Sequence, residues 1–240
     1  GMLITLGETF IKYYNLSIKR FSKGLQVEMG LRENTRVTLR AERVQLLQVL
    51  TNPLQRKLDL YKLKISLASS QDDIRKDRIQ IPGLPQEIVS RVMDYLYGEE
   101  VKEKEQYLPH SLMFFRRISR GMLPVLIAAG TIFLGFFTVN FGWAMSLAVL
   151  YILLMTVYQF LYFRSLKLSV SDDFMVKYSG VWIRRKQVLE MYKLQSITLS
   201  QPLWYKKRDL VNLTFHTSGG DVAFHLIKRN RAIPLINYLT

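Results

Sequence analysis

The longest hydrophobic pattern in the chain is a run of 43 residues, 121–163, without a single Asp, Glu, Lys or Arg. A bilayer core about 30 Å thick is crossed by roughly 20 apolar residues in a helix, so the run is long enough for two passes. Asn, Phe and Gly at positions 140–142 form a natural break at its middle. We therefore predict a transmembrane hairpin with helices at about residues 123–139 and 143–163, with Pro124 tolerated in the first turn.

The flanks of this run predict its orientation. Arg116, Arg117 and Arg120 precede it, and Arg164 and Lys167 follow it, whereas the turn between the helices has no cation. By the positive-inside rule, both outer ends of the hairpin therefore face the cytoplasm. The alternative is a helix pair buried in a soluble core, but such helices nearly always present a polar face, and neither half of the run has one.

The segments on either side of the run share a second pattern, short stretches of alternating apolar and polar residues, which is typical of antiparallel sheets. Several residues recur in both segments at an offset of 149 or 150, namely Gln45 and Gln195, Pro53 and Pro202, and Asp59-Leu60 and Asp209-Leu210. Each segment ends in an apolar helical pattern, at residues 85–97 and at about 231–239. The inward positions are expected to be Ile88, Val89, Val92, Tyr95 and Leu96 in the first helix and Ile233, Leu235, Ile236 and Leu239 in the second.

These patterns predict an α+β protein with membrane helices. Residues 13–97 and 164–240 are two copies of one domain, each an antiparallel β-sandwich or barrel of six or seven strands with a C-terminal helix. The remaining parts are an N-terminal segment at 1–12, a linker and juxtamembrane segment at 98–120, and the two-helix transmembrane hairpin at 121–163. Apolar residues and cations at 112–118 suit a segment lying along the membrane interface.

The charge of the chain narrows the choice of partners. Thirty-four Lys and Arg against nineteen Asp and Glu give a net charge of +15, which favours polyanions such as anionic lipid or nucleic acid. We expect a lipid bilayer with anionic headgroups rather than nucleic acid, because the aromatic residues fall at core or membrane positions. The hydrophobic content excludes a disordered chain, and the absence of cysteine excludes a disulfide scaffold.

Cations and aromatics near the hairpin are the predicted membrane-surface contacts. Each Lys or Arg near an anionic leaflet contributes about 1 kcal/mol, and amphipathic rings settle at the interface. The residues assigned to this contact are Arg116, Arg117, Arg120, Arg164, Lys167, Trp204, Tyr205, Lys206, Lys207 and Arg208. The alternative for any one cluster is that its charges only solvate a loop or a strand face.

No pattern points to catalysis, because the chain lacks a Gly-rich phosphate loop, a His-Glu-x-x-His motif and a nucleophile elbow. Residues 218–221 predict a tight hairpin. Pairing Phe215 with Phe224 across it places His216 and His225 together on the other face, but no third ligand is near. We therefore expect no catalytic, cofactor or metal site. The acidic part of the linker and its His110 are expected to be solvated.

The repeated plan resembles the bacterial pleckstrin-homology-like (PH-like) domain, also called the membrane-flanking domain. The resemblance rests on Arg43-Val44-Gln45, on residues 52–56 (Asn-Pro-Leu-Gln-Arg) and on Asp59-Leu60. The second copy is weaker, with Lys193 in place of the arginine. The resemblance implies a protein of the bacterial cytoplasmic (inner) membrane, with multiple passes and its domains in the cytoplasm, and this chain resembles the last two domains of a longer member.

This reading predicts a non-catalytic integral membrane protein whose cytoplasmic PH-like domains contact lipid or a protein partner at the inner leaflet. A pocket for inositol phosphates is not expected, because the first hairpin loop of the second copy carries Asp172 and Asp173. The alternative is a lipid-handling enzyme or transport subunit at the membrane surface. It would need a pocket with convergent polar groups, and an apolar cavity between a domain and the hairpin would favour it.

Overall fold

The structure is a computed structural model that describes residues 17–21, 24–29, 35–68, 78–98, 104–135 and 141–239. Within these, it describes the side chains of residues 40–68, 79–98, 104–124, 143 and 146–238. The predicted N-terminal segment 1–12, Asn140 at the predicted break and the linker residues 99–103 lie outside the described residues.

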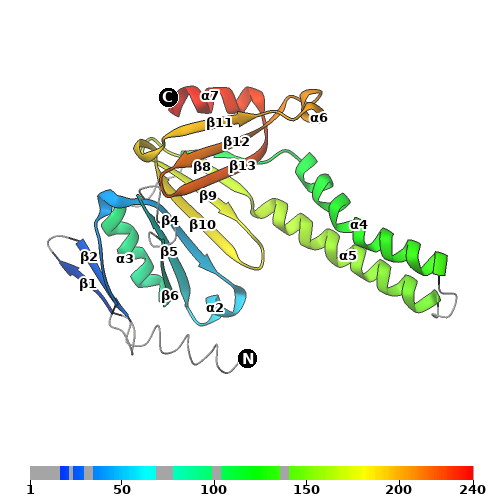
Figure 1. Cartoon of the computed structure of the whole chain (residues 1–240), viewed down its shortest axis with the longest axis horizontal. Helices are drawn as coiled ribbons and strands as arrows, with labels where there is room; N and C mark the ends of the chain where they lie inside the picture. The colour runs from blue at the N-terminus through cyan, green and yellow to red at the C-terminus, as the bar shows by residue number, and fades with distance from the viewer. Residues whose placement is uncertain are drawn as a thin grey trace.

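Both copies have the same order of elements (Figure 1). Copy one comprises β1 (Ser17–Phe21), β2 (Gly24–Met29), β3 (Thr35–Leu39), η1 (Ala41–Arg43), β4 (Val44–Thr51), α2 (Pro53–Lys57), β5 (Tyr61–Leu67), β6 (Arg78–Leu84) and α3 (Gln86–Tyr97). Copy two comprises β8 (Lys167–Val170), β9 (Phe174–Ser179), β10 (Arg184–Glu190), η2 (Met191–Lys193), β11 (Ser196–Ser200), α6 (Leu203–Lys206), β12 (Leu210–Thr217), β13 (Gly220–Lys228) and α7 (Arg229–Leu239). Between the copies lie β7 (Glu105–Tyr107), α4 (Leu112–Gly135) and α5 (Phe141–Ser165).

The strand registers repeat at an offset of 150 residues, which confirms the predicted duplication. In β4 and β5, Leu47 pairs with Ile65, and in β11 and β12 Ile197 pairs with Phe215. Likewise, the β2–β3 pair Leu25 and Leu39 corresponds to the β9–β10 pair Met175 and Leu189. Asp59 and Asp209 both have a positive φ, at 51° and 50°, a conformation that Asp tolerates better than most residues.

One seven-stranded sheet joins the two copies, an arrangement that the sequence patterns did not predict. Its order is β6-β5-β4-β10-β9-β8-β7, with β4 of copy one antiparallel to β10 of copy two. Side chains on one face of this sheet pack into the core of copy one, and side chains on the other face pack into the core of copy two. Leu46 of β4 packs into the core of copy two, while Val176 and Val188 of copy two pack into the core of copy one. The copies therefore form one folded body.

Polar contacts reinforce this junction. Lys193 is buried, pairs with Glu190, and donates from Nζ to the carbonyl oxygens of Ala41 (3.1 Å) and Val44 (2.7 Å). Burial, with the nearby Glu190 charge, raises the pKa of Tyr97 well above its usual range. The ring of Tyr97 meets Phe174 edge to face at 5.3 Å, so aromatic residues also bridge the copies.

The hairpin of β12 and β13 also contacts copy one. A two-residue turn is present, but it consists of Ser218 and Gly219 instead of the predicted Gly219 and Gly220. Thr217 therefore pairs with Gly220, and Phe215 faces Val222 rather than Phe224. A Cβ added to Gly219 would lie 2.6 Å from Cβ of Gln45 and 3.0 Å from Cβ of Ser66. Glycine at position 219 is therefore required for the close approach of this turn to β4 and β5.

Both helices between the copies begin before their predicted first residues. α4 begins at Leu112 rather than at about residue 123, so the segment 112–118 is the first part of this helix and not a separate interfacial segment. Pro124 consequently lies inside α4 and not in its first turn. At this internal position, proline removes one backbone hydrogen bond of the helix. α5 covers the predicted second helix and adds about one turn in total.

Two further expectations need correction, and the linker contains a strand that the sequence patterns did not predict. β7 pairs with β8 and buries Tyr107, whereas Lys104 and Glu105, at the end of the acidic part of the linker, are exposed as expected. Burial and the hydrogen bond to Glu105 raise the pKa of Tyr107 to about 12. His110 is half-buried, and its Nδ1 accepts a hydrogen bond from the backbone N–H of Leu112 (3.1 Å). In α7, Ile233 is exposed and Ala232 faces the core in its place, while Leu235 is buried as predicted.

Candidate functional site

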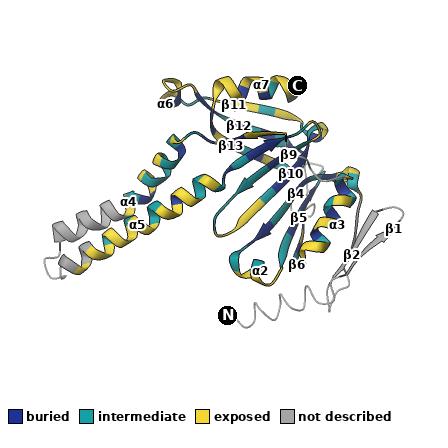
Figure 2. Cartoon of the chain, turned by 180° about the vertical axis from the view of Figure 1, so that it is seen from behind, coloured by how far each residue is buried: buried dark blue, intermediate teal, exposed yellow. Residues whose placement is uncertain are grey.

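α4 and α5 lie side by side and project away from the two-copy body (Figures 1 and 2). Among the described residues, one helical stretch, Ser146–Ser165, is long and apolar enough to cross a membrane, and only 6% of its apolar window is buried. A core helix of a soluble protein would be mostly buried. The large apolar and aromatic side chains that α5 exposes include Trp143, Leu147, Val149, Leu150, Tyr151, Leu153, Leu154, Val157, Tyr158, Phe160 and Leu161.

Polar contacts tie the two helices together near the body. Arg117 Nε donates to Oε1 of Gln159 at 2.7 Å, and its guanidinium lies 3.8 Å from the ring centre of Tyr162. Tyr151 donates from its hydroxyl to the carbonyl oxygen of Gly121 at 3.3 Å. Gln159 is buried, so its amide is satisfied within the helix pair. These contacts hold α4 and α5 together at the base of the hairpin.

α6 packs against this base. Arg116 donates from its guanidinium to the hydroxyl of Tyr205, and the same group lies 5.8 Å from the Tyr205 ring centre. Tyr205 is only 3% exposed and shares a small core with Met113 and Leu166. Tyr205 therefore does not lie on the predicted membrane-contact surface. It anchors α6 to the hairpin instead.

The other predicted surface residues divide into two groups. Arg120 and Arg164 are exposed near the start of α4 and the end of α5, and Lys167 is half-buried with Nζ 5.5 Å from the Tyr178 ring centre. The remaining residues, Trp204, Lys206, Lys207 and Arg208, are exposed on and after α6. The sequence pattern thus grouped residues that the structure places around the base of the hairpin.

Strand register shows that a second region lies at the same end of the body as the hairpin. β8 begins directly after α5, and its first residue, Lys167, pairs with Tyr178 near the end of β9. The chain then turns into β10, whose Arg184 pairs with Thr51 at the end of β4. The β9–β10 turn and α2, which follows β4, are therefore at the sheet end nearest α5 (Figure 1).

This end of the body exposes large apolar side chains, which we call the apolar rim. The rim residues and their exposed fractions are Leu54 (68%), Trp182 (67%), Ile183 (54%), Leu203 (81%) and Trp204 (74%). Leu54 and Leu203 occupy corresponding positions in α2 and α6, so both copies contribute. The turn carrying Trp182 depends on Gly180, which has φ of 95° and where a Cβ would lie 2.0 Å from the carbonyl oxygen of Ile183.

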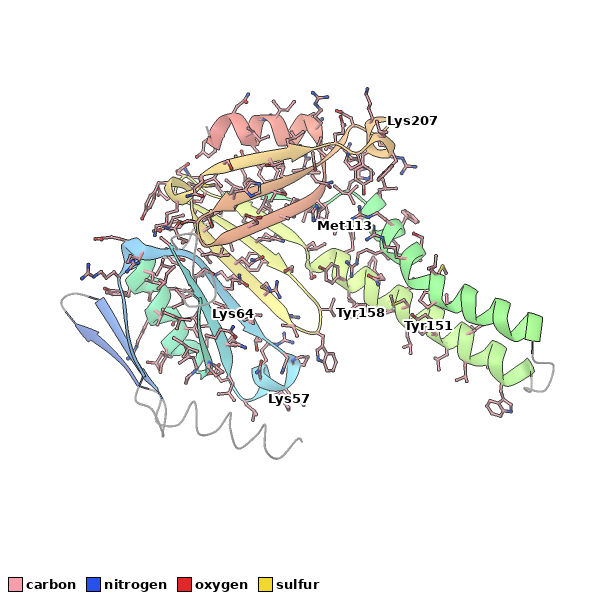
Figure 3. The ribbon with its side chains drawn as sticks, in the orientation of Figure 1. Lys57, Lys64, Met113, Tyr151, Tyr158 and Lys207 are labelled. Carbon is pink, nitrogen blue, oxygen red and sulfur yellow. The ribbon has the colours of Figure 1, made fainter. Side chains whose placement is uncertain are left out.

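Exposed cations accompany the rim. Lys57 follows Leu54 in α2, Arg184 follows Ile183, and residues 206–208 (Lys-Lys-Arg) follow Trp204. Figure 3 shows Lys57 and Lys207 at the α2 and α6 ends of this region, with Tyr151 and Tyr158 on the neighbouring α5. Of the rim residues, the sequence analysis predicted only Trp204 as a surface contact and missed Leu54, Trp182, Ile183 and Leu203. The available signal was that Trp182 and Ile183 fall beside a glycine, where strand alternation breaks.

A small polar cavity lies elsewhere, at the junction of the copies. It has a volume of about 220 Å³, and its charged lining consists of Lys64, Arg185 and Asp221. Asp221 Oδ1 also contacts Nδ1 of His216 at 2.9 Å. His225 lies apart from this pair, near Lys177 and Arg116, and partial burial with these charges lowers its pKa. The cavity does not border the hairpin and its lining is mostly polar.

Comparison with known families agrees with this architecture. A family model described as the bacterial PH domain matches residues 2–100 and 123–240. These two stretches contain the two copies whose strands share registers at an offset of 150 residues. No curated protein matches the chain. The chain therefore belongs to the bacterial PH domain family, and it contains two copies of the domain.

Proposed function

We propose that this protein is a non-catalytic integral membrane protein. In this proposal α4 and α5 form a transmembrane hairpin, and the two-copy body is a contact module at the cytoplasmic face of the inner membrane. Membership of the bacterial PH domain family suggests a protein- or lipid-contact module. The observation that carries the proposal is the coincidence of the exposed apolar α5 and the apolar rim at one end of the body.

The rim has the composition expected of a surface resting on lipid headgroups. Trp182 and Trp204 are amphipathic rings of the kind enriched at membrane interfaces. The cations beside them, including Lys57 and Arg184, each contribute about 1 kcal/mol near an anionic leaflet. Because the body is a single unit, contacts made by copy one and copy two act together, and the hairpin holds both at the surface.

The alternative of lipid handling receives no support from the cavity at the junction. That site is small and lined by Lys64, Arg185 and Asp221 among other polar residues, whereas an acyl chain needs a mainly apolar cavity. We therefore retain the contact module as the proposed function.

Membrane insertion is tested by placing charges on α5. The double variant Leu150→Arg/Leu154→Arg puts two cations near the middle of the helix, each costing about 2.5–3.5 kcal/mol in a bilayer. The matched control is Tyr192→Arg/Tyr238→Arg, since Tyr192 (76% exposed) and Tyr238 (57%) are large exposed side chains on the body, as Leu150 (52%) and Leu154 (59%) are on α5. The readout is the fraction of protein that stays with membranes after an alkaline carbonate wash.

We expect the unmodified chain and the control to stay in the membrane pellet, and the α5 variant to be released or degraded. If the α5 variant resists the wash as well as the unmodified chain, α5 does not cross the bilayer and the proposal is wrong.

A further inference from the structure

The two strands that meet at the junction, β4 and β10, are not equivalent strands of the two copies. Each copy has three strands before its 3-10 helix and three strands after it. β4 is the first strand after the 3-10 helix of copy one, whereas β10 is the last strand before the 3-10 helix of copy two. At the offset of 150 residues, β11 corresponds to β4 and β3 corresponds to β10. Among the described strands, β11 pairs only with β12 and β3 pairs only with β2, so each leaves one edge open. We propose that β11 of one chain pairs with β3 of a second copy of the chain.

The register of this pairing follows from the junction already present. Gln48 of β4 lies opposite Gln187 of β10. The corresponding positions are Thr198 in β11 and Val37 in β3, so these two residues become directly opposed between chains. The neighbouring pairs are then Ile197 with Thr38, Leu199 with Arg36, and Ser200 with Thr35.

β11 lacks the features by which proteins usually protect an open strand edge. Its sequence, Ser-Ile-Thr-Leu-Ser, contains no charged residue and no proline, and no register shift interrupts its pairing with β12. Four of its five residues are exposed, including Leu199. Such an edge is a ready template for another strand, and the chain already pairs the corresponding edge of β4 with a PH-like domain.

The polar contact at the junction also has a counterpart available. Lys193 of η2 reaches the carbonyl oxygens of Ala41 and Val44 of the preceding copy. The equivalent cation in copy one is Arg43, which is exposed. In the proposed pairing, Arg43 of the second chain reaches the carbonyl oxygens of Met191 and Leu194 of the first.

The pairing between chains is weaker than the pairing within one chain. The buried Leu46 and Leu50 of β4 correspond to the exposed Ser196 and Ser200 of β11, so less apolar surface is available. In copy two, Glu190 pairs with Lys193. In copy one, the residue that corresponds to Glu190 is Arg40, so Arg43 has no carboxylate partner at that position. Pairing of β11 with β3 is a heterologous contact, so a dimer still has one unpaired β11 and one unpaired β3. Further chains can add to these strands, which gives open chains of molecules unless a ring closes.

Cysteine cross-linking tests the proposal, and the chain offers a clean background because it has no cysteine. Two differently tagged full-length chains, one with Val37→Cys and the other with Thr198→Cys, are co-expressed and oxidised mildly in membranes. Directly opposed residues have Cα atoms about 4.5–5.5 Å apart, within the range of a disulfide. The positive control is Gln48→Cys/Gln187→Cys in one chain, which closes a disulfide at the corresponding pair.

We expect a mixed-tag dimer, and we expect its yield to fall several-fold when the second chain carries Ser200→Cys in place of Thr198→Cys, because diagonal neighbours are about 7–8 Å apart. Adding Arg43→Gln to the Val37→Cys chain should also lower the yield several-fold, while the positive control, with the same substitution, stays unchanged. The proposal is overturned if the positive control closes but no mixed dimer forms, or if the yield ignores the register. The proposal is also overturned if Thr198→Cys chains cross-link to one another as efficiently as they cross-link to Val37→Cys chains. That result would indicate that β11 pairs with β11.

Discussion

β4 and β11 are the same strand in two copies of one domain, yet one lies inside the molecule and the other at its edge. Both pair with the following strand in the same register. β4 buries Leu46, Leu47 and Leu50, whereas four of the five residues of β11 are exposed. The comparison shows that register and local fold follow from each copy's own pattern, while burial depends on which strand lies alongside.

The largest expected effect is a difference in unfolding free energy between variants of Lys193, which precedes β11, and of Arg43, which precedes β4. Lys193→Met leaves Glu190 buried without its partner and the carbonyl oxygens of Ala41 and Val44 without their donor. Breaking a buried pair in this way costs about 3–5 kcal/mol of unfolding free energy. Arg43→Met, at the equivalent exposed position, should change it by less than about 0.5 kcal/mol. Urea unfolding of the purified protein in detergent measures both, and equal losses would contradict the difference in burial.

The next effect compares corresponding apolar residues of the two strands. Leu47 has no exposed surface, and Leu47→Ala should lower the free energy of unfolding by about 2–5 kcal/mol. Ile197→Ala, at the corresponding half-buried position, should cost about 1 kcal/mol. The same urea titration tests this pair. A larger loss from Ile197→Ala would indicate that β11 is covered in the purified protein.

A smaller effect is expected where copy two touches copy one through its hairpin. Gly219→Ala places a methyl group against Cβ of Gln45 and of Ser66, and such overpacking costs about 1–3 kcal/mol. Ser218→Ala, in the same turn, serves as the control. Unfolding measurements should show a loss for Gly219→Ala alone, and equal stability of both variants would mean that the turn does not contact β4 and β5.

The smallest effect is a pH dependence confined to copy two. The pKa of His225 is lowered from 6.5, so the folded protein binds this proton less readily than the unfolded chain. Its contribution to stability is therefore complete above about pH 6.5 and is lost as the pH falls through the folded value. Replacing the imidazole in His225→Gln should flatten the dependence of unfolding free energy on pH below 6.5. An unchanged slope would show that His225 is not responsible.

The duplicated sheet-plus-helix plan was predictable because alternation, turns and the recurring Asp-Leu and proline positions are local signals. β6 was missed, since Pro82 interrupts its pattern. The structure shows that β6 is an edge strand, where proline is tolerated.

The β4–β10 junction was not predictable, because alternation gives the faces of a strand but not the partner at its edge. Tyr205 was placed on the surface with Trp204 for a similar reason. Adjacent aromatic residues look alike in sequence. Contacts with Arg116, 89 positions away, and with Met113 and Leu166 bury Tyr205 and leave Trp204 exposed. The apolar rim was missed because its residues come from three separate turns and helices that long-range pairing brings to one end.

Tryptophan fluorescence in vesicles tests the orientation of the body on the bilayer most directly. A chain with Trp143→Phe and Trp204→Phe retains Trp182 in the rim, at the start of β10. A second chain, with all three tryptophans changed to Phe and with Tyr192→Trp, reports on the opposite end of β10 at similar exposure. Both are reconstituted with phospholipid brominated near the headgroup end of its acyl chains. The proposed orientation predicts strong quenching of Trp182 and little quenching at position 192, and equal or reversed quenching would contradict it.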